Sequence, residues 1–160
     1  RSAVPSWASA SGGSLFEQTT VQAFRDAGAD VASIVDILDL GVYPTTAVKC
    51  GKIGYTLKAG PIKTCSRILE QELAQFPNLR AYLLMGDVAI RALNYIAKRR
   101  GAGRVIPSGS TYKIRDGIYH YGDARAFPSY LQAGPSFFIE KSKRQMIAED
   151  IAAALEVSRS

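Results

Sequence analysis

Hydrophobic residues recur every three or four positions in several segments, and this spacing predicts helices with one buried face. The first begins at a capping box formed by Ser14 and Glu17 and runs to Gly28, because a glycine readily ends a helix in the left-handed backbone conformation. The same periodicity predicts a short helix over residues 31–38, closed by Gly41, longer helices over 62–76 and from Asp87 to 96, and a last helix from Ser136.

Between these helices lie segments with the composition of strands. Residues 42–48 are rich in β-branched and aromatic side chains, and residues 80–85 form an apolar run without alternation, as expected for a strand buried on both faces. Residues 112–114 and 118–121 flank the dipeptide Asp116-Gly117, which predicts a hairpin. The segment 123–127 extends a further strand toward Pro128.

The alternation of helices and strands predicts an α/β fold, a three-layer α/β/α sandwich around a central, mostly parallel sheet. We expect a single domain over residues 1–160, of which 1–13 are an irregular N-terminal segment rich in Ser, Ala and Gly. Ligands of such sheets bind at the carboxyl ends of the strands. Three connections are therefore candidates for a site, namely 45–60, Gly86-Asp87 and 127–134.

The distribution of charge is uneven along the chain, which has a net charge of +6. Residues 40–69 carry five basic side chains and no acidic one, and residues 88–115 carry seven and none. Residues 14–40 are predominantly acidic. Basic segments of this kind favour a surface that binds phosphates, so we expect DNA, including single-stranded or damaged DNA, as the partner. The alternative is an ordinary solvated surface.

Composition narrows the compartment and the chemistry. No apolar run reaches the length of about 20 residues that a membrane span needs. The first residues have no basic stretch leading into an apolar core, so we expect no signal peptide. Two cysteines, Cys50 and Cys65, are few for a secreted disulfide scaffold, so we expect a cytoplasmic monomer. Because the first residue is Arg1, we expect a chain that was processed, tagged or cut from a longer protein.

The usual catalytic signatures give no assignment. The one histidine, His120, lies in a predicted strand and has no partners for a triad or a metal site, so we interpret it as structural or surface-exposed. The sequence has neither GxGxxG nor the phosphate-binding loop GxxxxGK[ST]. Two thiolates do not hold a four-coordinate zinc or an iron–sulfur cluster by themselves, so Cys50 and Cys65 alone favour two buried or free thiols.

Five collinear segments resemble the uracil-DNA glycosylase superfamily, and they are most similar to its bacterial and archaeal branch that carries an iron–sulfur cluster. Residues 41–50 read GVYPTTAVKC, where the family has GVYITNAVKC. Residues 127–131 read FPSYL, where the family has HPSxL. The other three segments are SGGSL over 11–15, CSRILEQEL over 65–73 and YLLMGDVA over 82–89.

The resemblance implies a DNA-repair protein that turns a damaged base out of the stack and hydrolyses its N-glycosidic bond. The base pocket would then form from Trp7, Thr46, Gly86 and Tyr130, with Phe127, Pro128 and Ser129 as the candidate catalytic loop. Lys49 and Arg125 would face the DNA backbone. Cys50 and Cys65 would be half of a [4Fe–4S] site, complete only if a longer form supplies two more cysteines.

The chain also departs from this family. Thr46 stands where the family has the uracil-reading Asn, and Phe127 where it has the catalytic His; neither replacement offers the same hydrogen bonds. Nothing over 1–13 resembles the family's water-activating motif. Phe127 either wedges into a base step or packs into the core. The sequence therefore leaves a glycosylase with a reorganised pocket, a non-catalytic nucleic-acid-binding relative, and a binder of small nucleotides or nucleobases.

Overall fold

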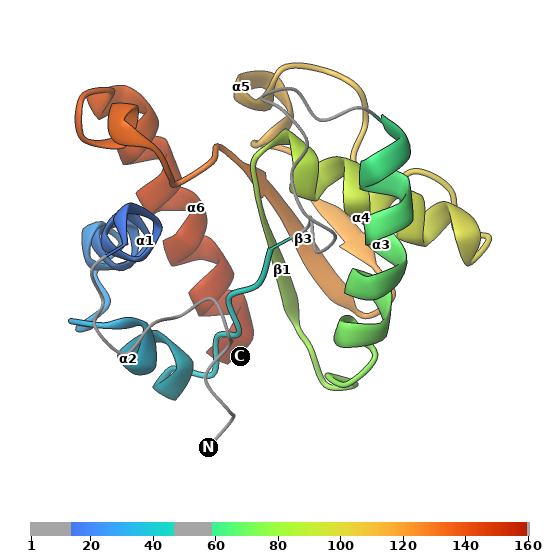
Figure 1. The fold of residues 1–160 in the computed structure, drawn as a ribbon, viewed down its shortest axis with the longest axis horizontal. Helices are drawn as coiled ribbons and strands as arrows, with labels where there is room; N and C mark the ends of the chain where they lie inside the picture. Colours follow the sequence, from blue (N-terminus) through green and yellow to red (C-terminus); the bar gives the residue numbers. More distant parts are fainter. Residues whose placement is uncertain (1–13, 47–58, 160) are drawn as a thin grey trace. The chain divides into compact units, whose positions relative to one another are not determined.

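A computed structural model describes residues 14–46 and 59–159 of the chain (Figure 1). The chain divides into two compact units, each built from segments distant in the sequence. Unit 1 comprises residues 1–45 and 130–153, and unit 2 comprises residues 46–129 and 154–160. The first unit is helical, and the second contains the sheet.

Unit 1 is organised around α1 (Leu15–Asp26), α2 (Ile34–Asp39), the 3-10 helix η1 (Pro135–Phe138) and the first part of α6 (Lys141–Arg159). The predicted helix start at Ser14 is confirmed, and the helix predicted over 31–38 begins later, at Ile34, with Ser33 as its N-cap. The Ser14 hydroxyl accepts the backbone N–H of Glu17 at 3.1 Å, and the Ser33 hydroxyl accepts that of Asp36 at 3.3 Å. The apolar faces are buried, with members Ala23, Phe24, Val31, Ile34, Ile37, Phe137, Ile147, Ala148 and Ile151.

Two side-chain contacts link the distant segments of unit 1. The Arg144 guanidinium donates to both carboxylate oxygens of Asp26, one of them at 2.9 Å, and so joins α6 to α1. The same guanidinium lies over the ring of Phe137, with 5.3 Å between its central carbon and the ring centre. The Gln132 amide donates to the Thr20 hydroxyl at 3.2 Å. These contacts fix the segment 130–144 to α1.

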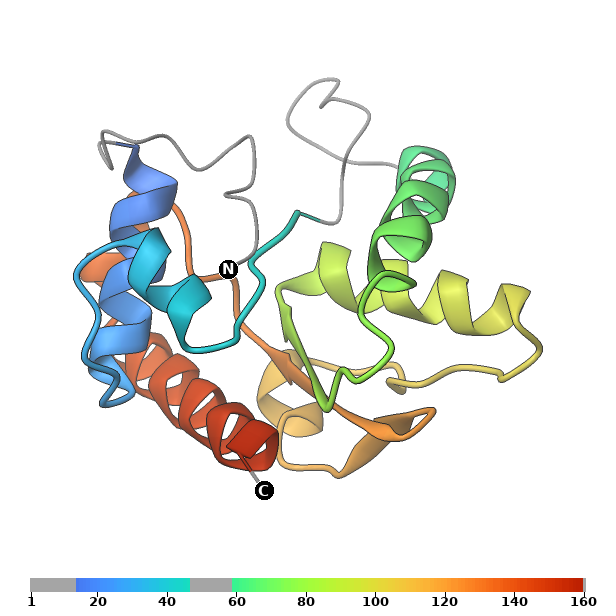
Figure 2. The same ribbon diagram turned by 90° about the horizontal axis from the view of Figure 1, so that it is seen from below.

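Unit 2 contains a three-stranded sheet in the order β1-β3-β2. β1 (Ala81–Met85) and β3 (Ala124–Ser129) are parallel, and β2 (Tyr119–Tyr121) pairs with β3 in the antiparallel direction. α4 (Asp87–Arg99) packs on β1, and α3 (Ala59–Leu73) packs on α4 (Figure 2). The predicted α/β class is thus confirmed at this coarse level, with a small mixed sheet.

Two hydrophobic clusters hold the layers of unit 2 together. The first lies between the sheet, α4 and the following loop, and its buried members are Leu84, Ile90, Leu93, Ile106, Ile114 and Ala126. The second lies between α3 and α4 and consists of Ile62, Leu69, Ala92 and Ile96. α4 therefore contributes to both clusters, with Ile90 and Leu93 in the first and Ala92 and Ile96 in the second.

Two predicted elements differ from the structure. The predicted hairpin at Asp116-Gly117 is wrong: residues Thr111–Ile114 form the short helix α5, and the hairpin turn follows at Gly122, whose φ is +61°. Residues 42–46 are described and form no strand, and the rest of the predicted strand lies outside the described residues. Pro44 has no N–H to donate to a sheet, which disfavours a strand there.

Candidate site at the carboxyl edge of the sheet

β1 and β3 end side by side, and their ends bring two of the resembling segments together. Met85 pairs with Ser129 in the parallel register. One residue further on, the Gly86 N–H donates to the Ser129 carbonyl at 3.0 Å. This is the edge of a parallel pair at which α/β proteins bind ligands. Gly86 and Ser129, which were predicted site residues, are therefore neighbours.

Gly86 connects β1 to α4 in a conformation that favours glycine. Its φ is +100°, where a side chain would be strained. The predicted helix start at Asp87 is confirmed, since Asp87 is the first helical residue and Gly86 is the N-cap, with no side-chain cap. The positive end of the 13-residue helix α4 thus lies at the candidate edge, a position that favours an anion.

Phe127, Pro128 and Ser129 lie within β3 and not in a loop as predicted. All three are buried, and Phe127 is 8% exposed. Of the two interpretations of Phe127, the structure agrees with packing in the core. The residues stay in the strand because their neighbours in β1 pair with them along its whole length. Only the carboxyl end of this segment, at Ser129, reaches the candidate edge.

Arg125 lies near the other end of β3. Its guanidinium carbon is 4.5 Å from the centre of the Phe127 ring, on the same face of the strand. Its Nε is buried and has no hydrogen-bond partner among the described residues. With a rise of about 3.3 Å per residue, Arg125 is about 13 Å from Ser129 along the strand. Arg125 and Gly86 are therefore too far apart to bind the same phosphate group.

The remaining predicted base-binding residues are placed only in part. Thr46 is half-buried and belongs to unit 2. Tyr130 belongs to unit 1, where the Lys143 ammonium lies 5.5 Å from the centre of its ring. Trp7, Lys49 and Cys50 lie outside the described residues. His120 is exposed on β2, in agreement with its interpretation as a surface residue.

Cys65 lies on the buried face of α3 and is disulfide-bonded. An iron–sulfur cluster requires thiolates, and a disulfide sulfur has none to offer. Among residues 14–46 and 59–159, no three His, Cys, Asp or Glu side chains gather in a group that could hold a metal ion. The described residues thus do not fit a cluster in this state, and no step of the proposed chemistry passes through one.

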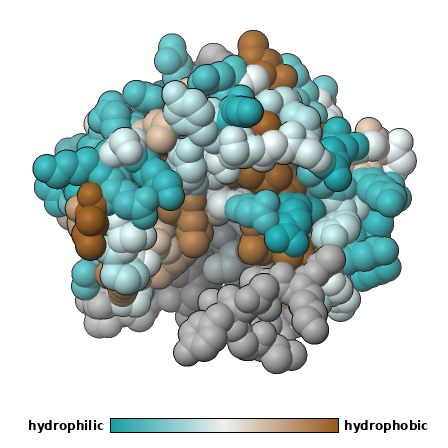
Figure 3. Space-filling view, turned by 90° about the horizontal axis from the view of Figure 1, so that it is seen from above, coloured by the Kyte–Doolittle hydropathy of each residue, from teal (hydrophilic) through white to brown (hydrophobic). Residues whose placement is uncertain are grey.

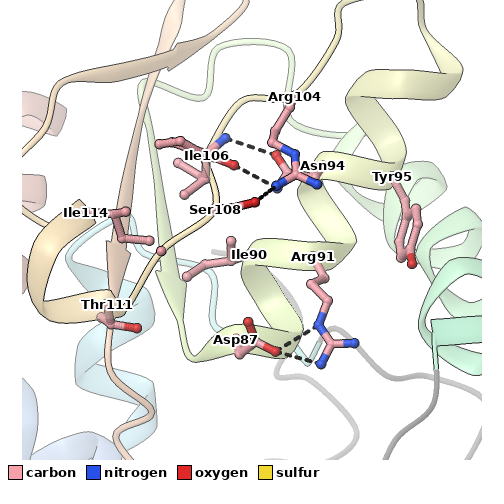
Figure 4. Close-up of a pocket in the computed structure, with 12 residues that line it drawn as sticks. Asp87, Ile90, Arg91, Asn94, Tyr95, Arg104, Ile106, Ser108, Thr111 and Ile114 are labelled. Carbon is pink, nitrogen blue, oxygen red and sulfur yellow. Dashed lines mark hydrogen bonds and ion pairs between the residues drawn. The ribbon is translucent and has the colours of Figure 1, made fainter.

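Next to the edge, a pocket of about 310 Å³ lies between α4 and the segment 104–114 (Figure 4). Asn94 fixes its wall: its amide donates to the Ile106 carbonyl at 3.1 Å, and its oxygen accepts the N–H groups of Val105 and Ile106 at 2.9 and 3.0 Å. Arg91 and Arg104 line the pocket. Sequence reasoning missed this pocket, although the basic run over 88–115 was a signal for it.

The charged groups of the pocket are arranged in two places. Arg91 pairs with Asp87 one turn earlier on α4, with 2.7 Å between nitrogen and oxygen, and both side chains are largely exposed. Arg104 donates to the Ser108 hydroxyl on the facing segment. Figure 4 shows Arg91 at the Asp87 end of the pocket and Arg104 beside Asn94. Two guanidinium groups against one carboxylate leave the pocket positive.

Several apolar side chains are exposed on the surface. Tyr112, Ile118, Leu131 and Ile139 are each more than half exposed. On the face seen in Figure 3, hydrophobic residues occur among hydrophilic ones. No helix in the described part of the chain combines the length and apolar character that crossing a membrane requires.

Comparisons with protein families, with curated proteins and with solved structures found no match for this chain.

Proposed function

We propose that the protein is a DNA-repair protein of the uracil-DNA glycosylase type, which binds DNA, turns out a damaged base and hydrolyses its N-glycosidic bond. One observation carries the proposal. The segments 82–89 and 127–131, which resemble that superfamily, meet at the carboxyl edge of β1 and β3 through the Gly86–Ser129 hydrogen bond. In an α/β protein this edge is where a ligand binds.

The environment of this edge suits a phosphate backbone. Gly86 contributes no side chain at the start of α4, and the positive end of a helix favours an anion such as a backbone phosphate. The seven basic residues over 88–115 include Arg91 and Arg104 of the adjoining pocket. Such contacts position a strand without reading its sequence, while a flipped base is held by stacking and hydrogen bonds, and Thr46 is the candidate for a hydrogen bond in unit 2.

The full sandwich of three layers, a cytoplasmic location and a monomeric state belong to the same proposal. A cytoplasmic location has a chemical consequence for Cys65. In a reducing compartment its disulfide is reduced, and the thiol is then available to a cluster if a longer form supplies further cysteines.

The test is base release from a labelled single-stranded oligonucleotide with one uracil, followed by alkaline cleavage of the abasic product. We expect cleavage at the uracil, and its reduction in Thr46→Val. Gly60→Ala is the matched control, since a methyl group there meets no atom within 4 Å. Phe127 is unsuitable for this purpose because it is buried, and its substitution also disturbs the core.

A second candidate, a non-catalytic nucleic-acid-binding relative, is favoured by a specific observation. Phe127 replaces the family's catalytic His, and its buried ring has no proton to donate to a departing base. In that case the oligonucleotide binds in a salt-dependent manner and no base is released. If the protein neither cleaves nor binds the oligonucleotide, both candidate functions are contradicted.

A further inference from the structure

The pocket between α4 and the segment 104–114 is separate from the residues proposed for base release. It opens beside the edge proposed for the flipped base, but its walls come from other residues. Its volume of about 310 Å³ exceeds what a single anion fills and reaches the lower end of the range for small-molecule sites. The volume of the pocket therefore suits a ligand of about the size of one nucleotide.

The cations of the pocket indicate the charge of that ligand. In the part of the chain that the structure describes, Arg104 has no carboxylate partner, and its recorded contact is with the Ser108 hydroxyl. Arg91 is held by Asp87, so its guanidinium is oriented before a ligand arrives. A planar guanidinium presents paired N–H donors that match phosphate oxygens. The hydroxyl groups of Ser108 and Thr111 are additional donors on the facing wall.

The apolar wall indicates the rest of the ligand. Ile90 and Ile114 line the pocket with 7% of each residue exposed and form its apolar floor, and the fully buried Ile106 belongs to the same cluster. Asn94 fixes the backbone of 105–106 and therefore the position of this floor. A site with cations at its rim and an apolar floor suits a molecule with a phosphate group and a flat or ring-shaped apolar body.

We propose that this pocket binds a nucleotide by its phosphate, with Arg104 and Arg91 on the phosphate oxygens and the sugar and base against Ile90 and Ile114. The ligand is either a free nucleoside monophosphate or one nucleotide of a DNA strand that continues past the edge of the sheet. The proposal goes beyond base release and does not require it, since a non-catalytic protein would hold a nucleotide in the same way.

The test is calorimetric titration of the whole protein with thymidine 5′-monophosphate and, separately, with thymidine. We expect the phosphate to strengthen binding by about tenfold or more, since hydrogen bonds to charged groups are the strong ones. Arg104→Gln should weaken binding of the monophosphate about tenfold and leave thymidine unchanged. The matched control is Arg67→Gln, an exposed arginine on α3 outside the pocket, which should change neither affinity.

The proposal would be overturned by equal affinity for thymidine and its monophosphate, or by equal effects of Arg104→Gln and Arg67→Gln. Inorganic phosphate binding as tightly as the monophosphate would also overturn it, because the apolar floor would then contribute nothing. Competition by an unmodified single-stranded oligonucleotide identifies the ligand as part of a strand, and its absence identifies a free nucleotide. Base release is measured in parallel on Arg104→Gln, so loss of nucleotide binding and loss of glycosylase activity are distinguished.

Discussion

Asn94 on α4 makes three hydrogen bonds to the backbone of one neighbouring segment. Its amide nitrogen and oxygen together satisfy the Ile106 carbonyl and the N–H groups of Val105 and Ile106. No helical or sheet hydrogen bond is available to these backbone groups, because 105–106 lies in a loop. One side chain therefore determines the conformation of the loop that lines the pocket beside α4.

Replacement of Asn94 should consequently lower the stability of the protein. We expect Asn94→Ala to reduce the free energy of unfolding by about 2–3 kcal/mol, since partly buried backbone groups lose their partners. Urea denaturation followed by circular dichroism measures the change as a shift of the midpoint. Asn78→Ala, at an exposed turn position, is the control and should leave the midpoint unchanged; equal shifts for both variants would refute this role of Asn94.

Gly117 leaves the space that the Tyr119 side chain occupies. A methyl group at this position would lie 2.3 Å from the Tyr119 hydroxyl oxygen, and that hydroxyl donates to the Ile114 carbonyl at 2.8 Å. The absence of a side chain thus lets Tyr119 cap the end of α5. The dipeptide Asp116-Gly117 is of a kind that commonly forms a hairpin turn, but here it lies before β2 and not between two strands.

Gly117→Ala should therefore displace Tyr119 and destabilise the fold by about 1 kcal/mol, the contribution of one hydrogen bond. In Gly60→Ala, on α3, the added methyl group meets no atom within 4 Å and should be neutral or slightly stabilising. Thermal unfolding of the two variants against the parent tests the pair. A lower midpoint for Gly60→Ala than for Gly117→Ala would contradict the explanation.

At the scale of elements, α3 and α4 are joined by a charged network around Glu70. The Arg99 guanidinium donates to one Glu70 oxygen at 2.7 Å and to the Ser66 hydroxyl at 2.8 Å, and Arg100 donates to the other oxygen at 2.8 Å. The hydrogen bonds from Arg99, and then Arg100, hold the pKa of Glu70 below its ordinary value, while partial burial opposes this effect. The network supplements the apolar contact between the two helices.

This lowered pKa makes the network sensitive to acid. A carboxyl group with a lower pKa in the folded state stabilises the fold above its unfolded pKa, and this contribution is lost as the pH falls through the folded pKa. Glu70→Gln should thus cost about 1 kcal/mol at neutral pH.

Denaturation midpoints across the acid range measure how this cost depends on pH. The difference from the parent should narrow as the pH falls below the ordinary value of 4.5. Glu156→Gln, at an exposed position of α6, is the control and should show no such dependence. A difference between Glu70→Gln and the parent that is constant with pH would contradict the role of the carboxylate.

The sequence predicts helices better than it predicts the sheet. The hydroxyl caps at Ser14 and Ser33 and the apolar stripes are local features, and they place α1, α2 and α4 within a few residues. The strands depend on partners far along the chain. Whether Asp116-Gly117 or Gly122 makes the hairpin is decided by the position of Tyr119, which no local pattern contains.

In the candidate site, too, local features could be predicted and long-range contacts could not. Gly86 could be selected because a strand followed by glycine and a helix has a local signature, and the structure places it at the sheet edge. The pocket beside Gly86 could not be predicted from the sequence, because the pocket forms only when Asn94 holds the loop 105–106 against α4. The burial of Phe127 likewise depends on its pairing with Leu83 in β1, so the sequence left both of its interpretations open.

For the whole molecule, the uneven charge predicts how binding responds to salt. Affinity for a single-stranded oligonucleotide should fall steeply with salt, because each phosphate contact releases counterions. Removing one contact should reduce the slope of log affinity against log salt by about 0.7. Lys113→Gln, in the basic run over 88–115, should show this reduction, and Lys141→Gln, outside both basic runs, should not. Fluorescence anisotropy at several salt concentrations measures both slopes, and identical slopes would refute a phosphate contact at Lys113.

The contacts of unit 1 have a consequence for the order in which the molecule is made. Asp26 and Arg144 are 118 residues apart in the sequence, and Thr20 and Gln132 are 112 apart. During synthesis, α1 emerges from the ribosome long before the segment that covers it, and it waits while residues 46–129 are added. Its apolar face is open to chaperones during this interval, and the rate of synthesis through unit 2 sets how long that exposure lasts.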